Sequence, residues 1–368
     1  MRKIKRLTLT LCLLAMGLAA SAQPTPRHKL APTPPMGWMT WNLFKGDISD
    51  QLIRETADAM VENGFVEAGY KYIFIDDLWQ GGRDRHNNII PDPKKFPHGI
   101  KALADYVHSK GLKLGIYSDA AQLTCGGWTA SLGFEEQDAR TFASWGIDYL
   151  KYDYCNAPED SATARRRYKR MADALQHSGR DIVLGICEWG QRQCEEWCES
   201  VGGQLWRTSY DVRDMWKDIV GQGGMGILDI VNVTAPIAHN ARHGQWPDMD
   251  MLVVGLNGTG GPSSDLGGVG CTYVEYQTQM SMWCMMSSVL ALSNTSRSSA
   301  SSWRASGRPA TLPGSRSSWA SRHSRASTAH MPAGSPCSRR WRIHSSSLAW
   351  RPSSAHPMVV STVSGCSR

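Results

Sequence analysis

The sequence predicts an α/β protein, and more specifically a (β/α)8 (TIM) barrel. Between residues 33 and 293, short apolar stretches bounded by turns alternate with amphipathic stretches of helical period. Repeating βα units of this kind predict a parallel sheet. Polar side chains follow successive apolar stretches at intervals of 41, 36 and 35 residues, about one βα unit each. This spacing is typical of an active site at the C-terminal face of a barrel.

Four apolar stretches are predicted to be buried strands, and three amphipathic stretches between them to be helices. The first helix has Ser49 as its N-cap and Gly64 as its stop, and the other two end at Gly111 and Gly179. The predicted strands are residues 72–75, 112–117, 147–152 and 182–187.

The polar residues that follow these strands are the candidate site. A doubly wound sheet is the alternative fold, but no G-x-G-x-x-G loop follows a strand here. The barrel is therefore favoured. The residues are Asp76, Asp77, Tyr117, Asp153 and Glu188.

Lys151 and Asp153 lie two positions apart in the stretch YLKYDYC. Alternation along a strand places both side chains on one face. A charged pair that faces inward is expensive as structure alone. The pair is therefore predicted to serve catalysis.

The two ends of the chain differ from its centre. Residues 1–22 have a basic start, an apolar stretch and an A-x-A site, which predicts a signal peptide and export to the periplasm or medium. Residues 295–368 hold 22 Ser and 11 Arg and no Lys, Asp or Glu. This composition fits a disordered tail, but its isolated tryptophans favour out-of-frame translation.

Charge and hydropathy restrict the partners. Residues 23–294 hold 25 Lys and Arg against 33 Asp and Glu, a net charge of −8, although the whole chain carries +7. An acidic body argues against a nucleic-acid partner. No later stretch is apolar for 18 residues, so no membrane span is expected.

Six motifs, in order, resemble glycoside hydrolase family 27, the α-galactosidases. They are PPMGWMTWN (34–42), IFIDDLW (73–79), YLKYDYC (149–155), GICEWG (185–190), WRTSYDV (206–212) and DMDMLVVG (248–255). The resemblance covers residues 31–293. It implies a (β/α)8 barrel followed by an antiparallel β-sandwich, and hydrolysis with retention of configuration at the anomeric carbon.

By position in the motifs, the resemblance makes Asp153 the nucleophile and Asp211 the acid/base. Retention needs two carboxyl groups about 5–5.5 Å apart. Asp153 must be ionised, and we expect Lys151 to lower its pKa. Asp211 must hold a proton at the start of the cycle.

The resemblance also implies the residues that bind the sugar. Each hydroxyl needs a hydrogen-bond partner if the wrong epimer is to be excluded. Two adjacent aspartates on a strand point to opposite faces, so a metal site at 76–77 is the weaker interpretation. The sugar-binding residues are Trp41, Asp76, Asp77, Tyr117, Lys151, Glu188, Trp189, Arg207 and Asp250.

Further expectations follow from the resemblance. Cys125 and Cys155 match a family disulfide beside the pocket. The partner substrate is an α-galactoside. Displacement at an anomeric carbon needs carboxylates and positioning only, so no metal or organic cofactor is expected.

Departures from the family leave alternatives open. Gly190 after CEW resembles the plant and microbial α-galactosidases, but an α-N-acetylgalactosaminidase with room for a 2-acetamido group stays an alternative, and a β-L-arabinopyranosidase shares the scaffold. Residues 279–294 match the seventh helix and eighth strand, but the eighth helix and the sandwich are not recognisable after Asn294. The domains expected are a signal peptide (1–22), an incomplete barrel (23–294) and a tail (295–368). Such a chain is expected to fold poorly, and an inactive truncated product is a further alternative.

Overall fold

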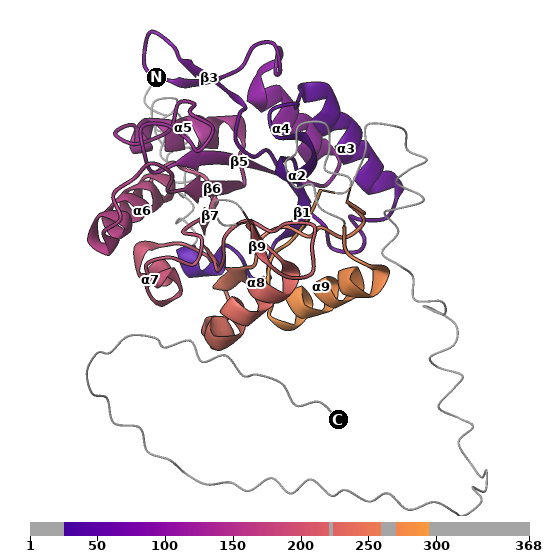
Figure 1. Ribbon diagram of the computed structural model, residues 1–368. Helices are drawn as coiled ribbons and strands as arrows, with labels where there is room; N and C mark the ends of the chain where they lie inside the picture. Colours follow the sequence, from indigo (N-terminus) through magenta and orange to yellow (C-terminus); the bar gives the residue numbers. More distant parts are fainter. Residues whose placement is uncertain (1–25, 221–223, 259–269, 294–368) are drawn as a thin grey trace, which may run out of the picture. The chain divides into compact units, whose positions relative to one another are not determined.

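The computed structural model describes residues 26–220, 224–258 and 270–293 (Figure 1). The predicted signal peptide and tail lie outside these ranges. Among the described residues, no helix is both long enough and apolar enough to cross a membrane.

Eight parallel strands form one sheet, as the sequence predicts. Their order is β11-β8-β7-β6-β5-β2-β1-β12, and each paired neighbour is parallel. The strands are β1 (Met36–Met39), β2 (Tyr72–Phe74), β5 (Lys113–Asp119), β6 (Tyr149–Asp153), β7 (Val183–Ile186), β8 (Leu205–Arg207), β11 (Trp246–Asp248) and β12 (Leu290–Leu292).

The two ends of this strand order also meet, so the sheet curls into a barrel. The Val289 N–H donates to the Pro247 carbonyl oxygen at 3.3 Å, beside β11. Beyond β11, the Leu252 N–H donates to the Ala291 carbonyl oxygen at 2.8 Å. β12 therefore lies between β1 and β11, and fewer bonds join it to β11 than to β1.

Helices connect the strands and lie around the outside of the sheet (Figure 1). Ser49 caps the first of them as predicted, because its Oγ accepts a hydrogen bond from the Leu52 N–H at 3.1 Å. Thr272 and Glu275 form a capping box at the last one. The main helices are α3 (Asp50–Glu62), α4 (Gly99–Ser109), α5 (Glu135–Trp145), α6 (Ser161–Gln176), α7 (Cys194–Val201), α8 (Ile227–Thr234) and α9 (Tyr273–Met285).

Smaller elements fill the remaining connections. Two antiparallel strand pairs lie within βα connections: β3 (Gln80–Arg83) with β4 (Ile89–Pro91), and β9 (Ile219–Val220) with β10 (Gly224–Met225). The short helices are η1 (Arg27–Lys29), α2 (Trp41–Phe44) and η2 (Ala235–Asn240).

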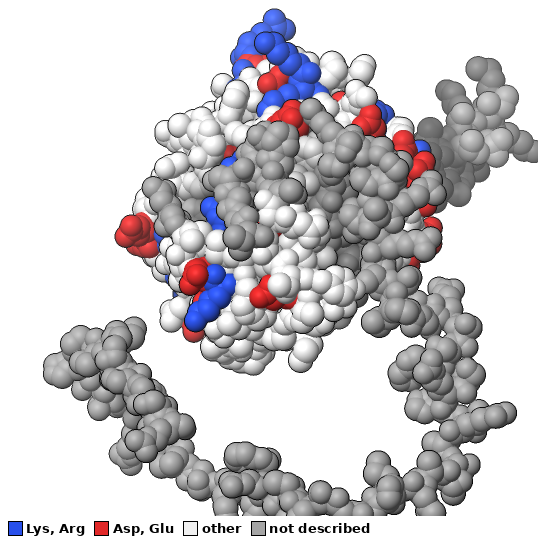
Figure 2. All heavy atoms as spheres, turned by 45° about the vertical axis from the view of Figure 1, so that its right-hand side comes forward, with Lys and Arg blue, Asp and Glu red and all other residues white. Residues whose placement is uncertain are grey.

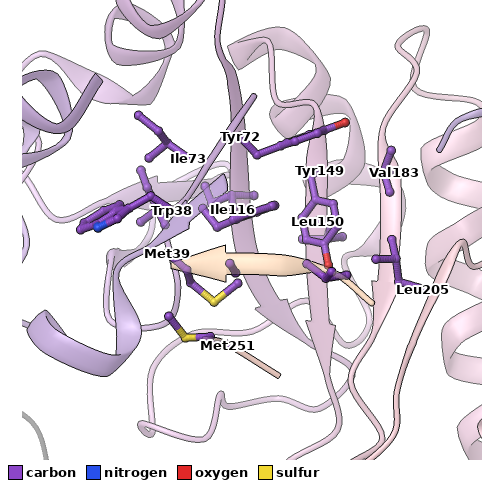
Figure 3. Packing of buried hydrophobic residues seen from close by; sticks show 14 of the residues in the cluster. Trp38, Met39, Tyr72, Ile73, Ile116, Tyr149, Leu150, Val183, Leu205 and Met251 are labelled. Carbon is purple, nitrogen blue, oxygen red and sulfur yellow. The ribbon is translucent and has the colours of Figure 1, made fainter. Parts of the chain in front are cut away.

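The strands carry almost continuous apolar sequence because both faces of the sheet are covered. Figure 3 shows side chains from β1, β2, β5, β6, β7 and β8 gathered into one core, with Met251 beside them. Ile73, Leu150 and Leu205 are fully buried there. This core holds the strand ends rigidly, and those ends carry the candidate site.

The outer surface is mixed. On the face in Figure 2, groups of acidic and basic side chains alternate with large areas of uncharged surface. Several apolar side chains of α9 are also exposed, among them Val274 at 67% and Met285 at 77%.

Candidate active site

A cavity of about 300 Å³ lies at the C-terminal ends of the strands. Its lining comes from residues within or just after seven of the eight strands, which is where a barrel places its active site. The lining residues are Trp41, Asp76, Asp77, Tyr117, Cys125, Lys151, Asp153, Trp189, Tyr210, Asp211, Arg213, Gly224, Asp250 and Met251.

Asp153 is the last residue of β6 and is 4% exposed. The Tyr117 hydroxyl donates to its Oδ2 at 3.1 Å, and the Tyr154 N–H donates to its Oδ1 at 3.0 Å. Lys151, two residues earlier on the strand, lines the same cavity, so the prediction that these two share a face is confirmed.

Burial outweighs the effect of Lys151 on the pKa of Asp153. Burial raises the pKa of Asp153 to about 6, although Lys151 lowers it. The cation offsets only part of the desolvation because its Nζ donates to Asp76 Oδ2 at 2.7 Å. Lys151 therefore lowers the pKa of Asp153 as expected, but burial raises it by more, and the carboxylate still predominates at neutral pH.

Asp76 and Asp77 line the same cavity, contrary to the expectation that they point to opposite faces. They follow β2, which ends at Phe74, so strand alternation no longer applies to them. Asp77 Oδ2 accepts a hydrogen bond from the Gly126 N–H at 2.8 Å, and its Oδ1 accepts one from the Leu78 N–H at 2.7 Å. Burial raises the pKa of Asp77.

A disulfide joins Cys125 to Cys155, as the family resemblance implies. Its Cα atoms are 5.1 Å apart. Cys155 follows Asp153 by two residues, and Gly126, which binds Asp77, follows Cys125. One covalent link therefore ties the end of β6 to the loop that holds Asp77. Because both sulfurs are used in this bond, they are not free thiolates for a metal ion.

Arg207 connects two carboxylates of the site. Its Nη2 lies 2.8 Å from Asp211 Oδ1 and 2.8 Å from Asp250 Oδ2, and the arginine itself is 1% exposed. Asp250 Oδ2 also accepts a hydrogen bond from the Val212 N–H at 2.7 Å. Arg207 thus sets the distance between the loops after β8 and β11.

Asp211 lies at the mouth of the cavity, with a side chain that is 51% exposed. Desolvation acts to raise its pKa, but Arg207 and Lys151 together lower it below the ordinary value. The proton expected on Asp211 is therefore disfavoured when the cavity is empty. The motif WRTSYDV contains both Arg207 and Asp211, but it does not show that the two form an ion pair.

Two predicted sugar-binding residues do not line the cavity. Glu188 is fully buried and forms an ion pair with Arg192, and burial raises its pKa to about 7. Arg207 lies behind Asp211 and Asp250. The neighbouring Trp189 does line the cavity, where its ring stacks on Tyr210 at a centroid distance of 6.5 Å.

Sequence reasoning did not identify several lining residues. Tyr210, Arg213 and Gly224 belong to the connection between β8 and α8, and Met251 follows β11. Loops carry no period that would show which side chains point inward. The nearness of Tyr210 to Asp211 in WRTSYDV was the available signal.

Comparison with known proteins identifies the family of this chain. The family model described as alpha galactosidase A matches residues 33–306. The chain is 43% identical over 295 residues to alpha-galactosidase A of Cellvibrio japonicus, covering 79% of this chain and 69% of that one. It is 45% identical over 289 residues to alpha-galactosidase 2 of Arabidopsis thaliana, covering 78% of this chain and 66% of that one.

A solved structure gives the same result for the fold. The crystal structure of alpha-galactosidase I from Mortierella vinacea matches with a TM-score of 0.66 and 39% identity, over 73% of this chain and 68% of that one. The alpha-galactosidase of Saccharomyces cerevisiae, solved with raffinose, matches with a TM-score of 0.68 and 35% identity, over 74% and 61%. The chain therefore belongs to glycoside hydrolase family 27, the α-galactosidase family of glycosidases.

Proposed function

We propose that the chain is a retaining glycoside hydrolase that releases terminal α-linked galactose from α-galactosides. The observation that carries this proposal is the convergence of Asp153 and Asp211 on one cavity whose other polar groups suit sugar hydroxyls. The raffinose-bound relative supports an oligosaccharide substrate.

The proposed reaction is a double displacement. Asp153 attacks the anomeric carbon while Asp211 protonates the leaving oxygen, and a glycosyl ester forms on Asp153. Asp211 then removes a proton from water, which attacks the anomeric carbon, breaks its bond to the Asp153 oxygen and releases galactose with its original configuration. The half-exposed side chain of Asp211 suits this second step, because water reaches it directly.

The sugar itself is proposed to bind deeper in the cavity. Asp76, Asp77 and Lys151 lie together there, and they offer charged partners for neighbouring hydroxyls. Asp250 is proposed to contact the 2-hydroxyl side, with Trp41 against the pyranose face. Arg207 is proposed to act through Asp211 and Asp250, since it is bonded to both.

Protonation of Asp211 is proposed to accompany substrate binding. In the empty cavity Arg207 favours its carboxylate. A sugar that covers the cavity removes water from Asp211 and thereby raises the cost of its charge.

The test is hydrolysis of p-nitrophenyl α-galactoside by the full chain, followed by proton NMR of the first sugar released. α-Galactose as the first product, with loss of activity in Asp153→Asn and Asp211→Asn, supports the proposal. β-Galactose as the first product, or full activity in either variant, contradicts it.

Two other specificities are the second candidates. The Asp76–Asp77 pair in the cavity favours a hexose with a 6-hydroxyl over a β-L-arabinopyranoside, which lacks that group. Assaying the p-nitrophenyl α-galactoside, α-N-acetylgalactosaminide and β-L-arabinopyranoside side by side separates the three. Preference for either of the last two would replace the proposed substrate.

Export is proposed as well. It is supported by the A-x-A site at residues 20–22 and by a disulfide, a bond that persists in oxidising compartments. N-terminal sequencing of secreted protein tests it: a mature N-terminus at Gln23 is expected, and retention of Met1 would contradict it.

A further inference from the structure

Asp119 is a second buried carboxyl group beside Asp153. It is the last residue of β5, fully buried, and pairs in register with Asp153, the last residue of β6. A carboxylate oxygen of each lies within 4.8 Å of the other and of the sulfurs of Cys125 and Cys155. Asp119 belongs to none of the six family motifs, and the proposed reaction does not use it.

The hydrogen bonds of Asp119 point to a role in holding the chain after the nucleophile. Its Oδ2 accepts a hydrogen bond from the Cys155 N–H at 2.9 Å. Its Oδ1 is buried and has no partner of good hydrogen-bond geometry among the described residues, although the Ala121 N–H acts on the carboxyl and lowers its pKa. A buried, unpaired carboxylate oxygen is costly, whereas a protonated oxygen at the same place carries no charge.

Among the described residues, none of the groups with the main electrostatic influence on Asp119 is a cation. Asp153 and Asp77 interact electrostatically with Asp119, and so do the hydroxyls of Tyr117 on its own strand, Tyr152 on β6 and Tyr168 on α6. The nearby cations are engaged elsewhere: Lys151 with Asp76, and Arg167 with the Ala120 carbonyl oxygen. Burial and the charge of Asp153 raise the pKa of Asp119 to about 9.

We propose that Asp119 is a positioning residue, a neutral carboxylic acid that anchors Cys155 without placing a second negative charge beside Asp153. This inference rests on the proposed function of Asp153 as the nucleophile. Two close carboxyl groups do not both ionise readily, so a proton held on Asp119 leaves Asp153 free to carry the charge it needs for attack.

Two substitutions separate neutrality from anchoring. Asp119→Asn keeps the shape of the side chain, an acceptor oxygen and the absence of charge. The value of kcat/KM at pH 7 therefore stays within about threefold of wild type, and the pH at which kcat/KM falls on the acidic side of its pH profile does not move. Asp119→Ala removes the acceptor for the Cys155 N–H, so kcat falls by about tenfold or more while KM changes little. Ser118→Ala is the matched control, because Ser118 is equally buried on the same strand but bonds Ser131, and it leaves both quantities unchanged.

The opposite results would overturn the inference. If Asp119 were ionised, Asp119→Asn would lower the pKa of Asp153 and move the acidic limb down by about one pH unit or more. If Asp119→Ala kept wild-type kcat, the anchoring role would be wrong. If Asp119→Ala does not fold, the acidic limb of the kcat/KM pH profile of Asp119→Asn still shows whether Asp119 is charged, because it shifts only if Asp119 is ionised.

A measurement without substrate separates this inference from the proposed function. Infrared difference spectra of the full chain between pH 7 and pH 10 are expected to show loss of a protonated carboxyl band, and Asp119→Asn is expected to lack that change. If the carboxyl band is seen but the chain has no α-galactosidase activity, the proposed function is refuted and the neutral state of Asp119 still holds. If the chain is active but the band is missing, only the neutral state of Asp119 is refuted.

Discussion

Asp153 carries its charge in a place where burial opposes it. Lys151 stabilises the carboxylate only in part, because Asp76 holds the ammonium group. The Tyr117 hydroxyl and the Tyr154 N–H add further stabilisation, but together these groups do not offset the burial. A carboxylate that is desolvated yet ionised suits the nucleophile proposed here, and it also costs stability.

Substituting Asp153→Asn tests both consequences. We expect kcat to fall on the order of 10³-fold or more, because the amide does not form the glycosyl ester. The folded-state pKa of about 6 exceeds the ordinary 3.8, so the native state binds more protons between these values and loses stability as pH rises through them. The amide avoids that loss, so its free energy of unfolding at pH 7 should rise by about 1–3 kcal/mol.

Urea unfolding of both proteins at pH 7 and at pH 4 measures this difference. The stabilising effect should shrink at pH 4, where Asp153 in the wild type is itself protonated. An Asp153→Asn variant that is less stable than wild type at pH 7 would show that burial is not the dominant influence on this carboxyl.

Activity should also fall as pH decreases through about 6, since protonated Asp153 does not attack. Initial rates at low substrate concentration, from pH 4 to 8, give kcat/KM for this limb. Pre-incubation at each pH and assay at pH 7 is the control for inactivation. A limb at pH 4 or below would contradict the raised pKa.

At the residue scale, the sequence predicted side-chain orientation within strands, where alternation applies, but not in the loops that follow them. Lys151 and Asp153 share a face because both belong to β6. Asp76 and Asp77 follow their strand, so the alternation argument failed for them. Glu188 was expected at the sugar, but Arg192, four residues later, pairs with it outside the cavity.

At the scale of elements, the loop between β5 and α5 acts as a brace. The Cys125–Cys155 disulfide fixes it to the end of β6, and the Gly126 N–H reaches Asp77 after β2. Three neighbouring strand ends are thus held by one loop. The sequence offered the cysteine pair only through the family resemblance, since spacing alone does not define connectivity.

Removing this brace with Cys125→Ser and Cys155→Ser together should lower the free energy of unfolding by about 2–4 kcal/mol, because the bond closes a long loop. The two cysteines are 30 residues apart. KM for the galactoside should rise as well, since Asp77 loses a fixed partner. Thermal unfolding and initial rates measure the two effects.

Cys284→Ser is the matched control for this pair, because that cysteine is free and exposed on α9. It should change neither quantity. A double variant with unchanged KM would show that Gly126 holds Asp77 without help from the disulfide.

At the scale of the whole molecule, the alternating pattern was enough to predict the barrel, and the seventh helix and eighth strand were identified from one stretch of sequence. The hairpins β3–β4 and β9–β10 were not predicted, because short polar strands carry too little pattern. The extent of each domain remains a prediction.

The junction between β11 and β12 depends on few contacts, so single bonds there matter. The buried Ser288 Oγ accepts a hydrogen bond from the Met249 N–H at 3.0 Å. Ser288→Ala leaves that N–H unpaired and should cost about 1–3 kcal/mol in urea unfolding. Ser281→Ala on the exposed face of α9, whose Oγ bonds only the Gln277 carbonyl oxygen, should cost much less. Equal effects of the two would contradict a special role for this junction.

The place of β12 between β1 and β11 also has a consequence for synthesis. The strand that completes the sheet is among the last described residues to leave the ribosome, while β1 is among the first. Until residue 292 has emerged, a nascent chain presents the open edges of β1 and β11, which are about 210 residues apart in sequence. Ribosome-bound chains that stop before β12 should therefore depend on chaperones, whichever sugar the finished enzyme prefers.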